Sequence, residues 1–343
     1  MIDSSHRVAD TAALLDVTFG DRLQRDVALA PLTTYRVGGN AALFVDVTTI
    51  DDLVAVANAR AITSIPVLVI GRGSNMLVAD AGFTGVVVSI ARFANDIEFD
   101  LSSSQVVAGG GVALPVLARR TAAASLAGFE WAVGVPGSVG GAVRMNAGGH
   151  GSDIAASLVD VEVFDFDAPS LVTRTMRSDE IGLRFRASSL PPSFVVVSAR
   201  LQLQAGDRDT SDREISDIVR WRREHQPGGQ NCGSVFVNPV PGEVTAGGLI
   251  DGLGLRGLKV GSAWVSDKHA NFIQATEGGT AADVRETIEI VRRRVAEATG
   301  YRLRSEVRLV GFDDADPLSF DAHPLALQQG TTNPTVVAEE ASP

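Results

Sequence analysis

The chain has 343 residues, which is long enough for two or three domains with their own cores at roughly 150 residues per domain. Its 30 Lys and Arg and 41 Asp and Glu give a formal charge of −11, which argues against a nucleic-acid partner. A single cysteine and the lack of a long uncharged apolar run favour a cytoplasmic protein, with no signal peptide and no membrane insertion.

The first two thirds of the chain mix helix and strand signals. We expect helices over residues 50–60 and 114–125, and a strand over 65–70 that runs into Gly71. Further strands are expected over residues 86–90, 97–99, 106–108, 159–164 and 194–204. This alternation predicts a mixed α and β fold.

The pattern changes after Gly206, where we place a domain boundary. The elements expected beyond it are a charged helix over residues 215–225, a short strand over 234–237, a helix over 246–252 and a strand over 271–274. A last helix begins after the capping residue Thr280 and ends at Gly300. Residues 313–343 show little periodicity and are interpreted as a tail.

Glycine is concentrated in loops that follow predicted strands. The segment Gly71-Arg-Gly-Ser-Asn-Met76 could hold a pyrophosphate through its amides, although a structural turn explains it equally well. It is not a Rossmann fingerprint, because Met76 replaces the third glycine and no acidic residue follows about 20 positions later. Residues 134–151 include seven glycines in 18 positions, which favours a cradle for a flat cofactor over a plain loop.

Three polar residues in the second half are candidates for chemistry, and each has an ordinary alternative. Arg186 could be a surface cation, Ser234 a turn or cap residue, and Glu306 an ion-pair partner. His150 could be a ligand or proton donor, but one loop histidine is more often neither. The cysteine and histidines lack the spacing of a metal site, so no metal is predicted.

Seven blocks resemble, in order, the UDP-N-acetylenolpyruvoylglucosamine reductases, flavoenzymes of peptidoglycan precursor synthesis. The blocks are Thr34-Tyr-Arg-Val-Gly-Gly39, Gly71-Arg-Gly-Ser-Asn75, Gly134-Val-Pro-Gly-Ser-Val-Gly-Gly141 with Asn146-Ala-Gly, Phe185-Arg-Ala-Ser188, Cys232-Gly-Ser-Val-Phe236, Asp267-Lys-His-Ala-Asn-Phe272 and Glu306-Val-Arg. The resemblance covers roughly residues 25–311, and the short stretch between Ser188 and Trp221 is similar to the branch without an inserted substrate-capping loop.

The resemblance implies an α+β chain: a two-subdomain FAD-binding fold of the vanillyl-alcohol-oxidase type plus a smaller α/β substrate-binding domain. The implied limits are an N-terminal extension over 1–24, the FAD-binding domain over 25–205, divided near 85–90, the substrate-binding domain over 206–312 and the tail over 313–343. It also implies non-covalent FAD, NADPH as co-substrate, a UDP-sugar substrate and no obligate protein partner.

The resemblance assigns residues to roles by their place in these blocks. Arg186, Ser234 and Glu306 would be catalytic, and Arg222, Asn238, Lys268 and Asn271 would bind substrate. The residues along FAD would be Gly71, Arg72, Gly73, Ser74, Asn75, Met76, Gly134, Pro136, Gly137, Ser138, Gly140, Gly141, Ala142, Asn146 and Gly148. The chain departs from the family where Phe185 replaces Tyr, Val237 replaces a frequent Lys and Gly149-His150 replaces Ala-Tyr.

The implied reaction has two halves in one site. NADPH reduces FAD, and the reduced cofactor then delivers a hydride to the enolpyruvyl group, with Arg186 on the carboxylate, Glu306 as hydrogen-bond donor and Ser234 protonating the α carbon. Two alternatives remain: an FAD oxidoreductase of the same fold with a different substrate, because of Val237, and a catalytically silent nucleotide-binding protein. The presence of all three polar residues argues against the last.

Overall fold

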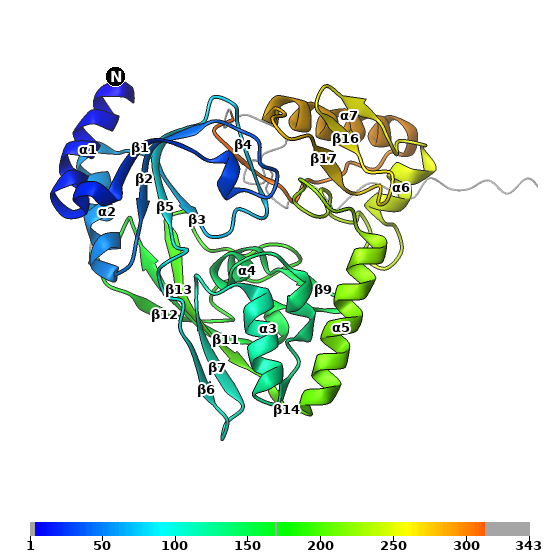
Figure 1. Cartoon of the computed structure of the whole chain (residues 1–343), viewed down its shortest axis with the longest axis horizontal. Coiled ribbons are helices and arrows are strands. Elements are labelled where there is room, and N and C mark those ends of the chain that lie inside the picture. Colours follow the sequence, from blue (N-terminus) through cyan, green and yellow to red (C-terminus); the bar gives the residue numbers. More distant parts are fainter. Residues whose placement is uncertain (1–3, 169, 313–343) are drawn as a thin grey trace, which may run out of the picture.

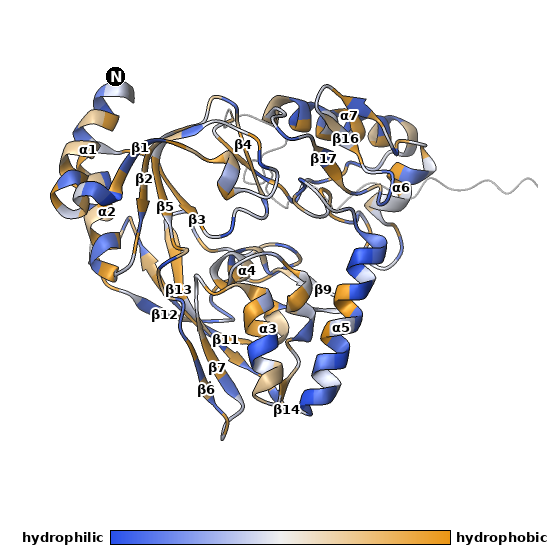
Figure 2. Ribbon diagram, viewed as in Figure 1, coloured by the Kyte–Doolittle hydropathy of each residue, from blue (hydrophilic) through white to orange (hydrophobic). Residues whose placement is uncertain are grey.

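The computed structural model describes residues 4–168 and 170–312, and the expected tail over 313–343 lies outside them. The first sheet has the order β1-β2-β5-β3, in which β1 is antiparallel to β2 while β2 and β3 are both parallel to β5. Its strands are β1 (Leu23–Ala28), β2 (Asn40–Asp46), β5 (Phe83–Ser89) and β3 (Val67–Ile70). Figure 2 shows that β2 and β5 are largely hydrophobic, as expected for strands inside a core.

Helices α1 (Ser4–Phe19) and α2 (Ile50–Thr63) lie side by side next to this sheet (Figure 1). Thr49 caps α2 in a capping box with Asp52, so the helix begins where the sequence predicted. The helix α1 was not predicted within the N-terminal extension. It contributes Leu15 and Phe19 to the same core as the strands of the first sheet.

The second sheet is antiparallel, in the order β12-β11-β13-β7-β6. Its strands are β12 (Arg174–Arg177), β11 (Leu158–Asp165), β13 (Phe194–Gln202), β7 (Gln105–Gly109) and β6 (Ile97–Asp100). Alternate residues of β13 enter different cores: Val195 and Val197 pack with the first sheet, whereas Val196 packs under α3 (Leu114–Ala123) and α4 (Val139–Met145). The second sheet therefore lies between the first sheet and these helices.

Helix α5 (Arg208–His225) follows and packs against the core under the second sheet. The C-terminal part after it is a small antiparallel sheet with helices, made of α6 (Ala246–Gly252), β15 (Lys259–Val260), β16 (Ala263–Val265), β17 (Ile273–Ala275) and α7 (Ala281–Thr299). The chain then returns to the first part, because β18 (Arg308–Val310) pairs in parallel with β4 (Met76–Val78). Asp80 strengthens this connection: its carboxylate accepts hydrogen bonds from the Ala281 and Ala282 amides at the start of α7, at 2.8 and 2.9 Å.

The remaining elements are short. They are η1 (Gly20–Arg22), η2 (Ala30–Leu32), β8 (Leu126–Ala127), η3 (Glu130–Gly134), β9 (Gly148–Gly149), β10 (Ser152–Asp153), η4 (Ile154–Ala156) and β14 (Gln204–Ala205). No helix within residues 4–168 and 170–312 combines the length and the apolar character needed to cross a membrane.

Three predicted elements differ in the structure. The helix expected over 215–225 begins at Arg208, because Asp207 caps it through the Thr210 amide. The strand expected over 234–237 is an irregular segment with one isolated bridge, from Phe236 to Ser305. The glycine-rich loop over 134–151 contains α4 and the strand β9.

Candidate active site

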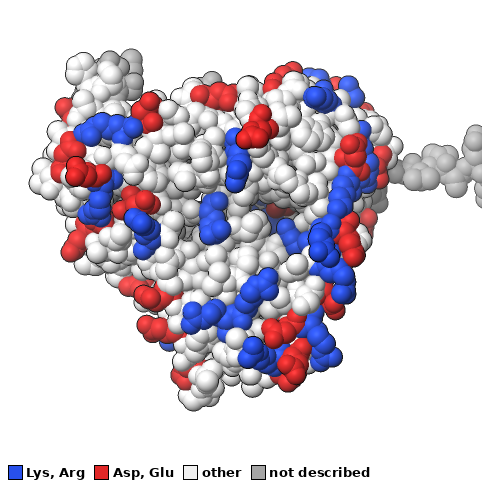
Figure 3. All heavy atoms as spheres, in the orientation of Figure 1, with Lys and Arg blue, Asp and Glu red and all other residues white. Residues whose placement is uncertain are grey.

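A cavity of about 940 Å³ is lined by residues from both sheets' connecting loops, from α5 and from the C-terminal part. Figure 3 shows a hollow on this face, between the regions drawn as β4, α4 and α5 in Figure 1, with basic side chains on its sides. A volume of this size is at the upper end of ordinary ligand pockets, which span roughly 300–1,000 Å³. The cavity can therefore accept a large ligand.

Two glycine-rich segments form one wall of this cavity. The segment over 71–76 connects β3 to β4, and residues 134–142 lead into α4. A Cβ atom added at Gly71 would collide with Ser138 Oγ, and one added at Gly137 would lie 3.5 Å from Ser74 Oγ. The two segments therefore approach each other so closely that glycine is needed at Gly71, which leaves backbone facing the ligand.

Most of the predicted cofactor residues line the cavity, and two do not. Gly140 instead packs α4 on the second sheet, where its amide donates to Gly110 O at 2.9 Å. Asn146 ends α4 in the left-handed region, with φ of 40°, and its side-chain amide bonds to Asp153 and to Arg184 O. These two residues shape the cradle without facing its ligand space.

Arg186 lies in the cavity and is held by the loop after α4. Its guanidinium donates to Gly148 O at 2.9 Å and to Asn146 O at 3.5 Å. The guanidinium carbon also lies 4.7 Å from the centre of the Phe185 ring, a cation–π contact that Tyr would equally provide. The backbone of Arg186 is left-handed, with φ of 56°, which is uncommon for a residue with a Cβ and typical of functional positions.

Arg144 organises the segment that carries Arg186. From α4 its guanidinium donates to the carbonyls of Leu190, Pro191 and Phe194, while its own carbonyl accepts from Ser188 Oγ at 2.7 Å. Arg144 also lines the cavity. Arg144 was not among the predicted site residues, because nothing in the sequence indicates that α4 packs against residues 188–194.

Glu306 lies next to Arg186 in the cavity. The distance from Arg186 Nε to Glu306 Oε2 is 3.7 Å. Burial raises the pKa of Glu306, an effect that Arg186 and Arg304 oppose but do not cancel. The side chain nonetheless remains 17% exposed, because it opens onto the cavity rather than into a closed core.

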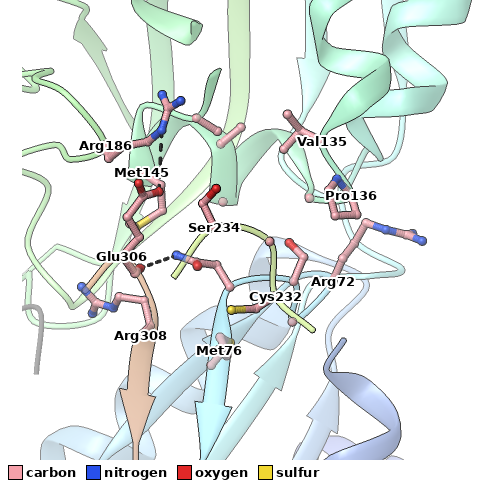
Figure 4. Close-up of a pocket in the computed structure, with 18 of the residues that line it drawn as sticks. Arg72, Met76, Val135, Pro136, Met145, Arg186, Cys232, Ser234, Glu306 and Arg308 are labelled. Atoms are coloured by element: carbon pink, nitrogen blue, oxygen red, sulfur yellow. Dashed lines mark hydrogen bonds and ion pairs between the residues drawn. The ribbon is translucent and has the colours of Figure 1, made fainter. Parts of the chain in front are cut away.

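Ser234 follows Gly233. The φ of Gly233 is 86°, a conformation that favours glycine at this position. Figure 4 shows the Ser234 hydroxyl, the Glu306 carboxylate and the Arg186 side chain pointing toward the same space. The backbone next to Ser234 pairs with that of Glu306, since the Glu306 amide donates to Val235 O at 2.8 Å. The three predicted catalytic residues are therefore neighbours in space, although up to 120 positions separate them in sequence.

Asn271 holds the segment that carries Ser234. Its Oδ1 accepts from the Phe236 amide at 3.0 Å, and its Nδ2 donates to Phe236 O at 2.8 Å. Asn238 acts similarly at α6, where its Oδ1 accepts from the Ala246 amide at 3.1 Å. Both residues line the cavity, but these side-chain bonds make them supports of its wall as well.

Arg222 and Lys268, two expected substrate residues, differ in location. Arg222 lines the cavity from α5, where burial lowers its pKa and its Cδ would lie 3.0 Å from a Cβ at Gly134. Lys268 is not among the lining residues, and its Nζ donates to Arg223 O at 2.6 Å. The expectation that Lys268 contacts substrate is thus not supported by its position in this structure.

Several further lining residues carry chemistry. Burial raises the pKa of Cys232 to about 12, so the thiol is neutral and unreactive at physiological pH. Burial, together with the charge of Arg222, lowers the pKa of His150. Trp221 lines the cavity from α5 and was not predicted, because its exposed position in a charged helix resembles an ordinary surface residue. No group of three His, Cys, Asp or Glu that could hold a metal lies in the described ranges.

Two family models match the chain. One, described as the UDP-N-acetylenolpyruvoylglucosamine reductase C-terminal domain, matches residues 225–310, and one described as an FAD binding domain matches residues 41–170. The chain is similar to the UDP-N-acetylenolpyruvoylglucosamine reductase of Synechococcus sp. (strain WH7803), with 40% identity over 86% of this chain and 95% of that protein. It is 41% identical to that of Heliobacterium modesticaldum over 81% of this chain and 88% of the relative.

A solved structure is also similar to the whole arrangement. The UDP-N-acetylenolpyruvylglucosamine reductase of Thermus caldophilus superposes with a TM-score of 0.70 and 35% sequence identity, covering 84% of this chain and 99% of that one.

Proposed function

The chain belongs to the UDP-N-acetylenolpyruvoylglucosamine reductase family, and we propose on that premise how the residues of its cavity perform the reaction. The protein is an FAD-dependent oxidoreductase that reduces the enolpyruvyl ether of UDP-N-acetylglucosamine enolpyruvate to UDP-N-acetylmuramate, with NADPH as reductant. Its α+β fold combines the FAD-binding fold of the vanillyl-alcohol-oxidase type with a smaller α/β domain.

The glycine-lined wall fits FAD. Gly71, Gly73 and Gly137 line the cavity without side chains, and the amides of these segments can bind the pyrophosphate of a long, flat cofactor. When bound there, FAD supplies the hydride carrier that links the two half-reactions. We propose that FAD is held without a covalent bond, because the Cys232 thiol is buried and neutral.

Arg186 is suited to bind the substrate carboxylate. Hydride addition at the enolpyruvyl group places negative charge on this carboxylate, and a guanidinium can stabilise it with two parallel hydrogen bonds. The carbonyls of Asn146 and Gly148 already fix the direction of the Arg186 guanidinium. No reorganisation of this side chain is then needed as charge develops.

Glu306 and Ser234 complete the proposed chemistry. The raised pKa of Glu306 favours its protonated form, in which the carboxyl can donate a hydrogen bond to the developing enolate. Ser234 lies beside it with its hydroxyl in the cavity and is placed to protonate the α carbon. A serine hydroxyl is a weak acid, so its effect depends on position.

Arg222 is the proposed partner of the substrate diphosphate. Val237, where relatives often carry Lys, is buried, is not a lining residue, and donates its amide to Arg304 O at 2.9 Å. The cavity therefore receives no positive charge from position 237. Arg222 lines it without a carboxylate in ion-pair contact among the described residues, so its charge is available to an anionic ligand.

We also propose domain limits and a location. The apolar side of α5 contributes Ile215 and Ile218 to the core of the second sheet, which supports a boundary later than the one expected at 206. A limit near 226 places α5 with the FAD-binding part.

A cytoplasmic location and a role in cell wall synthesis, cell shape and division follow from the proposed substrate.

The convergence of Arg186, Ser234 and Glu306 in one cavity carries the proposal. The purified protein should be yellow, and acid precipitation should leave the FAD in the supernatant. In single-turnover mixing, the UDP-sugar should reoxidise flavin that NADPH has reduced. Reduction by NADPH without reoxidation by the UDP-sugar would instead favour the alternative of another substrate.

A further inference from the structure

We propose that Trp221, supported by His150 and His225, forms an aromatic subsite that holds the nucleobase of the UDP-sugar. This inference rests on the proposed function and adds to it the part of the cavity that recognises the base. Trp221 is 42% exposed and lines the cavity, whereas Trp131 is buried in the core and does not line it. An exposed indole at the wall of a nucleotide-binding cavity offers a π face to a planar ring.

Contacts with two histidines restrict the ring of Trp221. His225 stacks on it with ring centres 4.7 Å apart and an angle of 13° between the planes. The Nδ1 of His225 lies 2.8 Å from Trp221 O, which fixes the histidine on the same turn of α5. His225 is not a lining residue, so we place this stack behind Trp221 as seen from the cavity.

His150 also lines the cavity and contacts Trp221. Their ring centres are 5.1 Å apart and their planes are nearly perpendicular, at 87°. The lowered pKa of His150 favours its neutral form at physiological pH, so this contact is between two neutral rings. His150 and His225 thus restrict the indole without covering it, and little side-chain entropy remains to be lost when a base binds.

Charge next to the indole indicates which part of a ligand lies there. Arg222 follows Trp221 directly in α5, and both side chains line the cavity. A nucleotide presents a planar base close to an anionic diphosphate, and an adjacent indole and guanidinium match that pair of groups. The reductant NADPH also contains planar rings and phosphates, so the test below includes both nucleotides.

Calorimetry of the FAD-loaded enzyme measures the binding of UDP and, separately, of NADP⁺. Loss of stacking typically lowers base affinity by about 10-fold or more, so Trp221→Ala should weaken UDP by that factor. Trp221→Phe should restore most of the affinity. Binding of inorganic pyrophosphate, which has no base, should be unchanged in both variants. Val219→Ala is the matched control, because Val219 is 40% exposed on the same helix but does not line the cavity.

The outcomes separate the subsite from the proposed function. A wild-type enzyme that does not bind UDP would contradict the proposed function and the subsite with it. Wild-type binding of UDP with equal affinity in Trp221→Ala would overturn the subsite alone. If Trp221→Ala loses affinity for UDP and pyrophosphate alike, Trp221 only supports Arg222. If it loses affinity for NADP⁺ but not for UDP, the indole binds the reductant instead. Either result also overturns the proposal.

Discussion

Arg186 and Glu306 form a loose ion pair in the cavity, with 3.7 Å between Nε and Oε2, while the guanidinium donates to two backbone carbonyls. Burial nevertheless raises the pKa of Glu306, so the attraction of Arg186 does not outweigh the cost of burying the carboxylate. This balance suits a site in which Glu306 can hold a proton while Arg186 binds the substrate carboxylate as its anionic partner.

The raised pKa of Glu306 predicts a contribution to the pH dependence of stability. The folded state binds the Glu306 proton more tightly than the unfolded state, so this contribution is present below pH 4.5, the ordinary glutamate value, and is lost as pH rises through the raised pKa. In Glu306→Gln that loss should be absent. Melting temperatures of both proteins from pH 4.5 upward test this, with the exposed Glu243→Gln as control. Parallel curves for wild type and Glu306→Gln would contradict it.

Arg144→Lys should slow substrate reduction without loss of FAD. Lysine keeps the charge, but it cannot present the planar fork that reaches the carbonyls of Leu190, Pro191 and Phe194. The segment that carries Arg186 should then be less well placed, and we expect kcat for the UDP-sugar to fall by on the order of 10-fold. Flavin content and UDP affinity should be retained. The exposed Arg119→Lys serves as control. If kcat is unchanged, Arg144 does not position Arg186.

Asn271→Ala should destabilise the protein through the segment around Ser234. The change removes the partners of the Phe236 amide and carbonyl, and each buried group left without a partner costs about 1–3 kcal/mol. Denaturant unfolding should show a loss of this size or larger, compared with the exposed Asn58→Ala. A loss no larger than that of the control would mean that other contacts hold the segment.

The seven sequence blocks, in their order, predicted the family, the cofactor and most of the residues that line the cavity. They could do so because such motifs contain residues that the local backbone requires, such as the glycine at position 71. Gly140 was assigned to FAD although it packs on Gly110, since a motif does not distinguish a glycine that faces a ligand from one that permits close packing. The α5 start was missed despite a readable signal, the cap Asp207.

Contacts between parts of the chain that are far apart in sequence could not be predicted from the sequence. The pairing of Val235 with Glu306, and the return of β18 to β4, depend on how three parts of the fold pack together. The local periodicity of hydrophobic residues predicts helices and strands, but it does not show which distant segments pair with each other. The same reason explains why Lys268 was assigned to the substrate site, whereas in the structure it does not line the cavity and its Nζ donates to Arg223 O.

Rapid-mixing measurement of both half-reactions in Ser234→Ala tests the central claim most directly. Flavin bleaching by NADPH needs no proton from Ser234, so its rate constant should be almost unchanged. Recovery of the flavin colour on mixing with the UDP-sugar should slow by on the order of 10²- to 10⁴-fold, because a positioned general acid is lost. Ser234→Cys should recover part of this rate. Equal slowing of both half-reactions in Ser234→Ala would contradict the account and leave Ser234 a structural residue.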